Sequence, residues 1–406
     1  MARKKMDSLL SSVKVQHLGR VYRLIEQFDL ISRIDLSKLS GFVPASITAL
    51  TRDLIGAQFI MERTSQSTVV RGRPAMGLCI SPFYWQTLCA TLTEDRLDIV
   101  LCDLTDEIFA HQQYTLMQED FLNLEQIVLN HVLSFAEQNK DKISHLLAFS
   151  IAVAGQLDKE KQTIRLGTHY LNLDLNELFE PYFKVPVIVS EYFKDWVAAE
   201  STLGSAINCN DVLFLQLDDV INLSVLLQGQ FLQTDKQIRM NINRVNLPKV
   251  TPWSEQINQH LSEIEKYEFQ HQLTHEAIYQ LIDLAFPNNA LENTSQKINF
   301  LCTQANENNE SAVKILHHLA DSLSYVLMNL VNMFSSEKIV ISSSLLGAKK
   351  IFLERLNKKL NENLLLDELH VEIATSKYPW NSAVVANSAI KQCLYDGSLL
   401  AHVLVS

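Results

Sequence analysis

Glycine is scarce in this chain. The sequence has 11 glycines among 406 residues, whereas an average composition contains roughly 7% glycine. Loops that bind phosphate through bare backbone N–H groups depend on glycine, because it lets the backbone approach the phosphate closely. The composition therefore argues against a fold that uses glycine-rich loops to bind phosphate.

Paired cysteines and long apolar runs are also missing. The six cysteines are scattered and form no CxxC pair: Cys79, Cys89, Cys102, Cys209, Cys302 and Cys393. Their spacing argues against a disulfide framework or a zinc ribbon and favours reduced thiols. Leu9–Leu10 is too short for the apolar core of a signal peptide, and the most apolar helical stretch, Ser324–Phe334, is far shorter than a membrane span. We therefore expect a cytoplasmic protein.

Charge is unevenly distributed along the chain, whose net charge is −11. Residues 1–74 hold 12 Lys and Arg residues against 6 Asp and Glu residues, whereas residues 75–406 hold 23 against 40. A basic N-terminal part on an acidic body points to a polyanion that binds at the N-terminus. Charge alone leaves a merely solvated basic surface as the alternative. The length favours two or three domains.

Three short helices are predicted in quick succession near the N-terminus. Apolar residues at helical spacing predict the first over Val13–Phe28. Ser32-Arg33-Ile34-Asp35 has the form of a capping box, so a second helix should begin after Ser32 and stop at Gly41. Pro44 suits the first turn of a third helix, from Val43 to about Ile55. The short turn between the last two helices is typical of a helix-turn-helix, with an ordinary helical hairpin as the alternative.

The third helix would turn small and hydroxyl-bearing residues outward. These residues are Ala45, Ser46, Thr48, Ala49 and Arg52, opposite the apolar Ile47, Leu50, Leu54 and Ile55. Small residues let a helix enter the major groove of DNA, and hydroxyls and a guanidinium can contact base edges or phosphate. We also expect Lys14, Arg33 and Lys38 to contact phosphate.

A wing and a basic hook are predicted to follow. Gln58–Arg63 and Ser67–Val70 indicate two short strands around a polar turn. Directly after them comes Arg71-Gly72-Arg73-Pro74. Its glycine lets the backbone lie close to the floor of the minor groove, and its arginines reach along the groove, where A·T tracts concentrate negative potential. A basic linker is the alternative for this tetrapeptide, but its place after a winged helix-turn-helix favours the hook.

The remainder of the chain alternates between strands and helices. Strands are predicted at Gln86–Leu92, Leu97–Leu104, Ile108–Tyr114, Leu146–Val153, Val185–Ser190, Val212–Leu217, Asn222–Leu227, Lys338–Ser343 and near Val371–Thr375. Helices are predicted at Asn123–Asn139, Ser254–Phe286 and Glu310–Phe334, a surface loop within Asn288–Glu310, and an amphipathic segment at Leu394–Val405. Strand sets and helices that alternate twice over predict two α/β lobes with a cleft between them.

These patterns give an expected domain division. Residues 1–80 should form the DNA-binding domain, 81–190 the first α/β lobe, and 191–406 the second lobe with an oligomerisation region. The C-terminal helix could instead pack back on the first lobe.

Several segments carry a resemblance to a known family. They are Val21-Tyr22-Arg23-Leu24-Ile25, Ser32-Arg33-Ile34-Asp35-Leu36-Ser37, Pro44-Ala45-Ser46-Ile47-Thr48, Arg71-Gly72-Arg73-Pro74-Ala75 and Tyr395-Asp396-Gly397-Ser398-Leu399-Leu400. On these segments the chain resembles the ROK family (repressors, open reading frames, kinases), and within it the glucose- and N-acetylglucosamine-responsive repressors. The resemblance implies fold class α/β, with a winged helix-turn-helix ahead of a two-lobed, actin-like sugar-kinase fold. It also implies a homodimer or homotetramer on palindromic, A/T-rich operators, and a sugar or a phosphotransferase-system protein as effector.

The same resemblance implies that catalytic residues are replaced. Counting back from the matching Trp196 places Tyr192 where the family kinases have their catalytic aspartate, and Glu191 where a histidine is usual. A phenol is a poor base at neutral pH. Glu191 and Asp195 lie close enough in sequence that this position alone does not exclude catalysis.

The phosphate-binding positions that the resemblance implies are altered as well. Asn222 and Ser224 stand at glycine positions of the phosphate hairpin, and Asp218-Asp219 at its start would repel ATP. Ser342 and Ala386 replace two further glycines of the nucleotide site. We therefore expect no catalytic residue and no bound cofactor.

The zinc site of the family is also missing. Its Glu-x-Gly-His segment corresponds to Met240-Asn241-Ile242-Asn243, and no cysteine lies between Cys209 and Cys302. Tetrahedral zinc needs about four nitrogen or sulfur ligands. His260 lies nearby, and His271 and His275 are spaced to share a helix face, but two or three scattered histidines are too few. We expect no metal, and the loss of the glutamate at Met240 makes ordinary sugar recognition doubtful.

The sequence therefore predicts a DNA-binding transcriptional regulator, a repressor of carbohydrate uptake or metabolism genes, and not an enzyme. Two alternatives remain open. One is an active sugar kinase that carries a DNA-binding head, and the other is a repressor controlled by a protein partner instead of a sugar.

Overall fold

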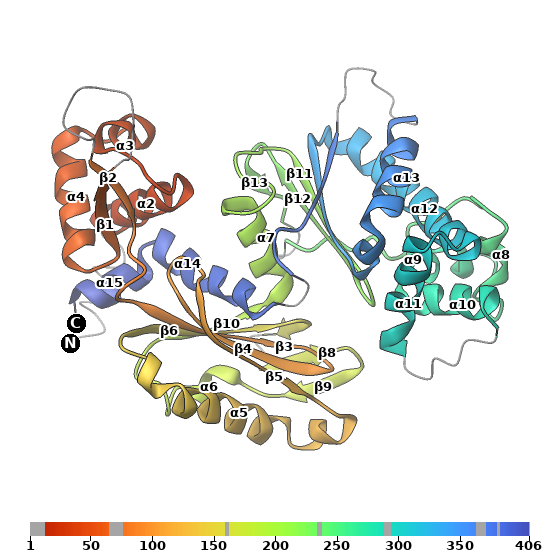
Figure 1. Cartoon of the computed structure of the whole chain (residues 1–406), viewed down its shortest axis with the longest axis horizontal. Coiled ribbons are helices and arrows are strands. Elements are labelled where there is room, and N and C mark those ends of the chain that lie inside the picture. The colour runs from red at the N-terminus through yellow and green to blue at the C-terminus, as the bar shows by residue number, and fades with distance from the viewer. Residues whose placement is uncertain are drawn as a thin grey trace. The chain divides into compact units, whose positions relative to one another are not determined.

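The computed structural model describes residues 13–64, 76–158, 162–233, 238–287, 294–362, 371–379 and 382–405, and Figure 1 shows the course of the chain. Contacts divide the chain into two compact units, Met1–Ala199 with Asn381–Ser406, and Glu200–Trp380. The first unit thus extends past residue 190, the expected end of the first lobe, and it includes the C-terminal residues.

The first unit begins with three helices, α2 (Val13–Gln27), α3 (Arg33–Ser40) and α4 (Pro44–Gly56). Ser32 is the N-cap of α3, and its hydroxyl oxygen accepts a hydrogen bond of 3.1 Å from the backbone N–H of Asp35. Gly41 ends α3 with φ at 72°, a left-handed conformation that glycine adopts without strain. The predicted N-cap and the predicted stop of this helix are therefore confirmed.

A two-stranded hairpin completes what we call the N-terminal module. β1 (Ile60–Thr64) pairs antiparallel with β2 (Met76–Ile80). Backbone hydrogen bonds of 3.0 and 2.8 Å join Ile31 to Leu78, so the hairpin is fixed to the loop that precedes α3. β1 matches the first predicted wing strand, whereas the second, Ser67–Val70, lies outside the described residues.

A mixed five-stranded sheet in the order β10-β6-β3-β4-β5 forms the body of the first unit. Its strands are β3 (Gln86–Leu92), β4 (Arg96–Asp103), β5 (Ile108–Thr115), β6 (Leu146–Val153) and β10 (Val187–Glu191). β3, β4 and β5 are antiparallel, and β6 runs parallel to both β3 and β10. As Figure 1 shows, α5 (Leu124–Gln138) and α6 (Leu175–Phe179) cover one face, and α14 (Asn387–Tyr395) lies on the other. The other elements of this unit are β7 (Gln156–Asp158), β8 (Thr163–Leu166), β9 (His169–Asn172), α15 (Ser398–Val405) and most of α7 (Tyr192–Thr202).

The second unit contains another mixed five-stranded sheet, in the order β13-β12-β11-β14-β15. Its strands are β11 (Val212–Leu217), β12 (Ile221–Leu227), β13 (Gln230–Phe231), β14 (Lys338–Ser342) and β15 (Glu372–Thr375). Its helices are α8 (Trp253–Gln256), α9 (Phe269–Leu273), α10 (His275–Ala285), α11 (Thr294–Asn306), α12 (Glu310–Phe334) and α13 (Lys349–Glu362). Two sheets flanked by helices confirm the predicted α/β class.

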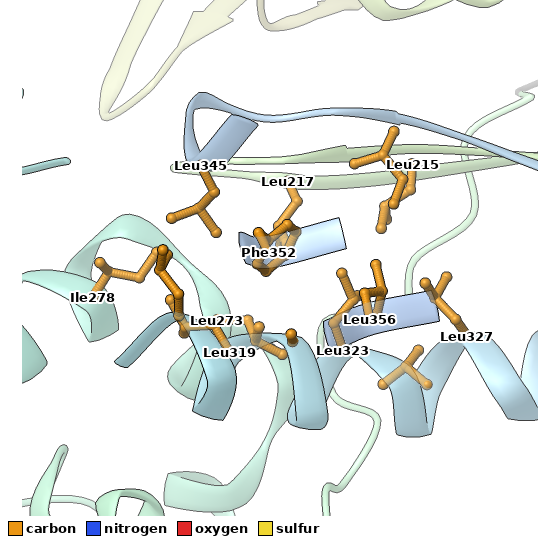
Figure 2. Packing of buried hydrophobic residues seen from close by; sticks show 14 of the residues in the cluster. Leu215, Leu217, Leu273, Ile278, Leu319, Leu323, Leu327, Leu345, Phe352 and Leu356 are labelled. Atoms are coloured by element: carbon orange, nitrogen blue, oxygen red, sulfur yellow. The ribbon is translucent and has the colours of Figure 1, made fainter. Parts of the chain in front are cut away.

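The core of the second unit lies between its sheet and the helix pair α12 and α13. Figure 2 shows Phe352 of α13 between Leu217 on the sheet and Leu319 on α12, and all three side chains are fully or almost fully buried. Burial of one side chain of this size stabilises the fold by roughly 2–3 kcal/mol. In the part of the chain that the structure describes, no helix combines the length and the apolar character that a membrane crossing requires.

The predicted helix Ser254–Phe286 is wrong, because α8, α9 and α10 divide this range into shorter pieces. Side chains bond to the backbone where these helices meet. Asn258 donates to the carbonyl of His271 at 2.5 Å, and the hydroxyl of Thr274 donates to that of Gln270 at 2.7 Å. Such bonds compete with a continuous ladder of helical hydrogen bonds.

Two other segments also differ from expectation. Much of Asn288–Glu310, expected to contain a surface loop, is the helix α11, with Ile298, Leu301 and Cys302 buried at helical spacing. Leu394–Val405 is divided between α14 and α15, because Gly397 adopts φ of 87° and interrupts the helix.

α14 joins the N-terminal module to the sheet of the first unit. The ammonium of Lys391 lies 2.8 Å from Glu26 Oε1 on α2 and 2.6 Å from Asp106 Oδ2 in the turn between β4 and β5. Asn387 donates to Asp106 Oδ1 at 2.6 Å, and the hydroxyl of Tyr395 donates to Glu26 Oε2 at 2.8 Å. One buried cation and two carboxylates therefore connect α2, α14 and the sheet.

The electrostatics of this junction favour a charged lysine. Burial lowers the pKa of Lys391, but attraction to Glu26 and Asp106 outweighs burial and raises the pKa above its ordinary value. Burial raises the pKa of Glu26, and the neighbouring ammonium reverses only part of that rise. Each charge is therefore tolerated in the interior only because the others are present.

Glycine allows the helices at this junction to approach closely. A Cβ at Gly19 on α2 would collide with the carbonyl oxygen of Tyr395 at the end of α14. A Cβ at Gly397 would collide with Val15 on α2. The backbones are thus in contact at two points on either side of the α14 terminus, which fixes the N-terminal module against α14.

Lys391→Met should destabilise the first unit by about 3–5 kcal/mol at pH 7.5, because it leaves the buried Glu26 and the partly buried Asp106 without their cation. The loss should shrink at pH 5.5, since an unpaired buried carboxyl group can take up a proton. Urea unfolding at both pH values measures this. Lys140→Met, at an exposed pair with Glu137, is the control and should change nothing measurable. An equal loss at both pH values would contradict the assignment.

Candidate nucleic-acid interface

α4 has one buried and one exposed face. Ile47, Leu50 and Leu54 are buried against the rest of the N-terminal module, and Ile55 is half-buried. The opposite face presents the residues expected from the sequence, Ala45, Ser46, Thr48, Ala49 and Arg52, all of them exposed. A helix of this kind can approach a surface closely, because no long side chain other than Arg52 stands in front of it.

The hydroxyl groups on α4 are not equally available. Thr48 Oγ1 donates to the carbonyl of Pro44 at 2.9 Å, so Thr48 offers an outside partner an acceptor oxygen and a methyl group. Thr51 is buried, and its hydroxyl donates to the carbonyl of Ile47 at 2.8 Å. Ser46 has no hydrogen bond of its hydroxyl to any of the described residues, so it can donate or accept.

The predicted phosphate contacts have different surroundings. Arg33 pairs with Glu62 at 2.7 Å and donates to Thr51 Oγ1 at 3.2 Å, so it joins α3 to β1 and α4. Lys14 pairs with Asp53 at 2.7 Å. The side chain of Lys38 is 73% exposed and lies 3.6 Å from its nearest carboxylate, on Asp35. Lys38 is therefore the most available of the three, whereas Arg33 has an internal structural role that the sequence did not indicate.

The predicted hook, Arg71-Gly72-Arg73-Pro74, lies outside the described residues. In the sequence it falls between β1 and β2, whose end residues Thr64 and Met76 pair with each other. Its role remains a prediction.

Sequence reasoning missed one exposed apolar residue beside this face. Val43 is the N-cap of α4 and is 63% exposed, and no side-chain hydrogen bond caps the helix. The signal in the sequence was a valine immediately before the helix-starting Pro44, at a position where Ser, Thr, Asp or Asn is usual.

The residues at the expected catalytic positions serve the core of the first unit. Tyr192 is the first residue of α7 and is 2% exposed. Glu191 ends β10, and its Oε1 accepts a hydrogen bond of 2.8 Å from the backbone N–H of Leu157. Asp195 is buried and accepts a hydrogen bond from Ser190. These side chains hold β10, α7 and β7 together.

The turn between β11 and β12 is held by side chains from two other segments, Ser344 after β14 and His275 on α10. Asp218 Oδ1 accepts hydrogen bonds from the backbone N–H of Ser344 at 2.8 Å and from its hydroxyl at 2.6 Å. The two ring nitrogens of His275 lie 2.9 Å from Asp218 Oδ1 and 2.9 Å from Asp219 Oδ1. An imidazolium ion therefore bridges the two carboxylates that the sequence predicted would repel ATP.

The polar residues at expected glycine positions lie in regular structure. Asn222 and Ser224 are buried in β12, opposite Gln216 and Phe214, so they belong to a strand rather than to a loop. Asn222 donates to Gln216 Oε1 at 2.6 Å. The side chain of Asn222 thus occupies space that a glycine would leave open.

The histidines do not form the arrangement expected from their spacing. His271 is on α9 and His275 begins α10, so the two do not share one helix face, and His260 is exposed. Across the described ranges, no group of three or more His, Cys, Asp and Glu side chains is placed to hold a metal ion.

The charge of His275 depends on its two partners. Burial lowers the pKa of the imidazole, but hydrogen bonds to Asp218 and Asp219 and their negative charges outweigh burial and raise it from 6.5 to about 9. A histidine whose pKa is higher in the folded state stabilises that state fully below its unfolded pKa. The contribution is then lost as the pH rises through the folded pKa.

His275→Gln should therefore flatten the pH dependence of stability between pH 6.5 and pH 9. The native chain should lose up to about 3 kcal/mol of unfolding free energy over this range, because the imidazolium deprotonates. Urea unfolding at several pH values measures the slope. His260→Gln removes an exposed histidine and should leave the slope unchanged. A native slope identical to that of His275→Gln would refute the bridge.

Comparison with known proteins places the chain in context. The sequence profile of the ROK family matches residues 88–234 and 276–392. The DNA-binding transcriptional repressor Mlc of Escherichia coli (strain K12) is 24% identical over 403 residues, which cover 97% of each chain. The DNA-binding transcriptional dual regulator NagC of the same strain is 24% identical over 398 residues, 97% of this chain and 96% of NagC.

Solved structures show the same likeness. The crystal structure of a ROK family transcriptional regulator, described as a homolog of the E. coli MLC protein, is 26% identical and covers 97% of this chain and 100% of its own, with a TM-score of 0.76. A ROK family glucokinase from Streptomyces griseus, in complex with glucose and AMPPNP, is 12% identical and covers 75% and 98%, with a TM-score of 0.57, which shows a shared fold alone. Since the family profile matches more than half of the sequence, this chain belongs to the ROK family.

Proposed function

We propose that this protein is a DNA-binding transcriptional repressor of carbohydrate uptake or metabolism genes. The observation that carries the proposal is the exposed face of α4, where small residues precede Arg52 with no carboxylate among them. The likeness to Mlc and NagC supports it, because both are named as DNA-binding transcriptional regulators and the matches include the N-terminal module.

In this proposal the N-terminal module is a winged helix-turn-helix. α4 enters the major groove with Ala45, Ser46, Thr48 and Arg52 at the base edges, while Lys14, Arg33 and Lys38 lie near phosphates. Arg71-Gly72-Arg73 enters the adjacent A/T-rich minor groove. A homodimer or homotetramer would place two such modules on the halves of a palindromic operator.

The body is, in this proposal, a two-lobed, actin-like kinase fold without catalysis. Tyr192 is buried, and Glu191 is hydrogen-bonded to the backbone. His275 holds the hairpin of Asp218 and Asp219 closed. A nucleotide would have to displace the pairing of His275 with Asp218, both largely buried, to reach the backbone there, so we expect neither a nucleotide nor a metal cofactor.

The regulating signal is then a sugar or a protein of the phosphotransferase system. Met240 favours the protein partner, because it stands where the family's sugar-holding glutamate is expected and a thioether is only a weak hydrogen-bond acceptor. Its backbone N–H donates to the carbonyl of Leu223 at 2.7 Å, which fixes this segment against β12.

Purified full-length protein should select A/T-rich palindromic duplexes from a random DNA library. On a selected duplex, Arg52→Ala should weaken binding by about 5- to 150-fold, in line with about 1–3 kcal/mol for a base contact. Arg71→Ala with Arg73→Ala should weaken binding mainly for sites with A/T-rich flanks. Fluorescence anisotropy over a range of salt concentrations measures both effects.

Arg165→Ala is the control for this experiment, because Arg165 is exposed on β8, outside the N-terminal module, and it should leave affinity unchanged. Affinity of the native chain should fall steeply with salt as phosphate contacts release counterions. A chain that enriches no duplex even at low ionic strength would disprove the proposed function.

The protein should not phosphorylate a hexose, and millimolar ATP with magnesium should not raise its melting temperature, because a ligand stabilises only the state that binds it. Coupled-enzyme assays and thermal shift measure this, with a family glucokinase as the positive control. Turnover of glucose or N-acetylglucosamine at a rate near that of the control would favour the kinase alternative.

A further inference from the structure

The N-cap of α4 is unusual for its chemistry. Val43 takes the extended N-cap conformation, with φ at −64° and ψ at 149°, and its carbonyl accepts the first helical hydrogen bond, 3.1 Å from the N–H of Ile47. A hydroxyl or carboxylate at this position would cap the helix and strengthen it. The chain has instead an isopropyl group that is 63% exposed, so neither capping nor burial within the module explains the valine.

The surface around Val43 is rich in methyl groups. Ala45 and Ala49 are exposed. The hydroxyl of Thr48 donates its proton to the carbonyl of Pro44, so it cannot donate to an outside partner as well. Charge on the same face is positive, from Arg52, and the nearest acid along α4 is Asp53, paired with Lys14. An apolar, uncharged helix start, with a guanidinium about two turns farther along the same face, complements a polyanion that carries methyl groups.

Duplex DNA presents such a group in the major groove. The 5-methyl of thymine is the one apolar substituent among the base edges there, and it makes apolar contacts with small side chains. In helix-turn-helix proteins the first residues of the second helix are those that reach the base edges. Val43 precedes that first turn directly, on the side where the helix would enter the groove.

We propose that Val43 is a specificity-determining residue that contacts the methyl group of one thymine in each operator half-site. The inference rests on the proposed function, and it adds to Ala45, Ser46, Thr48 and Arg52 a contact that discriminates thymine from cytosine without a hydrogen bond. Loss of the thymine methyl should weaken binding, although the Watson–Crick pair is unchanged.

The test replaces each thymine of a selected operator half-site, one at a time, by deoxyuridine, which lacks only the methyl group. Full-length native protein should lose about fourfold in affinity at one such position, as expected for one buried methyl group. Val43→Ala should bind the thymine operator about fourfold more weakly and should no longer distinguish deoxyuridine at that position. Alanine, like valine, lacks a capping acceptor, so the substitution removes no N-cap hydrogen bond.

Leu39→Ala is the matched control, because Leu39 is also an exposed apolar residue of the module, 49% exposed on α3. It should keep the full sensitivity to deoxyuridine. The inference is overturned if every deoxyuridine position affects native and Val43→Ala proteins equally. Val43 would then be exposed for a contact with protein and not with DNA. If the native chain binds no duplex, the proposed function itself fails, and that outcome is distinct from the first.

Discussion

The buried ammonium of Lys391 is the constraint on which the arrangement of the first unit depends. It lies between Glu26 on α2 and Asp106 beside the sheet, and the buried charges of Lys391 and Glu26 depend on these partners. α2 packs against both α14 and α4, so the helix that carries Glu26 also supports the helix with the candidate interface. The N-terminal module is therefore held to the body by charge as well as by apolar contact, and a signal that reaches α14 has a physical route to the candidate DNA interface.

The sequence predicted most reliably what a single segment determines. β6 and β11 follow largely apolar runs, and the apolar spacing of α12 gave both of its ends. Breaks that depend on distant partners were not predictable. Asn258 ends a helix through the carbonyl of His271, and the return of α14 to the first unit depends on contacts between residues separated by most of the chain. The pattern of apolar and polar residues within one segment does not indicate such distant partners.

The candidate interface shows the same limit at the scale of single residues. The buried stripe of α4 fixed which side chains face outward, so Ala45, Ser46, Thr48 and Arg52 could be named from spacing alone. The sequence could not show that Thr48 donates to Pro44 or that Arg33 ties α3 to β1 and α4. These contacts decide which groups are available to a DNA partner. They leave the methyl groups of α4 and the ammonium of Lys38 as better candidates than the hydroxyl of Thr48.

The scarcity of glycine and the closed hairpin of the second unit have one physical cause. A phosphate-binding hairpin needs bare backbone and a positive potential, whereas here Asp218 and Asp219 are negative and His275 offsets only one of their two charges. Once side chains satisfy the hairpin, glycine has no advantage in the adjoining strand, and Asn222 can bond to Gln216 inside it. The bridge between His275 and the two carboxylates stabilises the fold most at pH values below the ordinary pKa of histidine. It holds the hairpin closed, whereas a substrate site has to open. A hairpin held closed is consistent with the proposed function, in which the body does no catalysis and carries the N-terminal module.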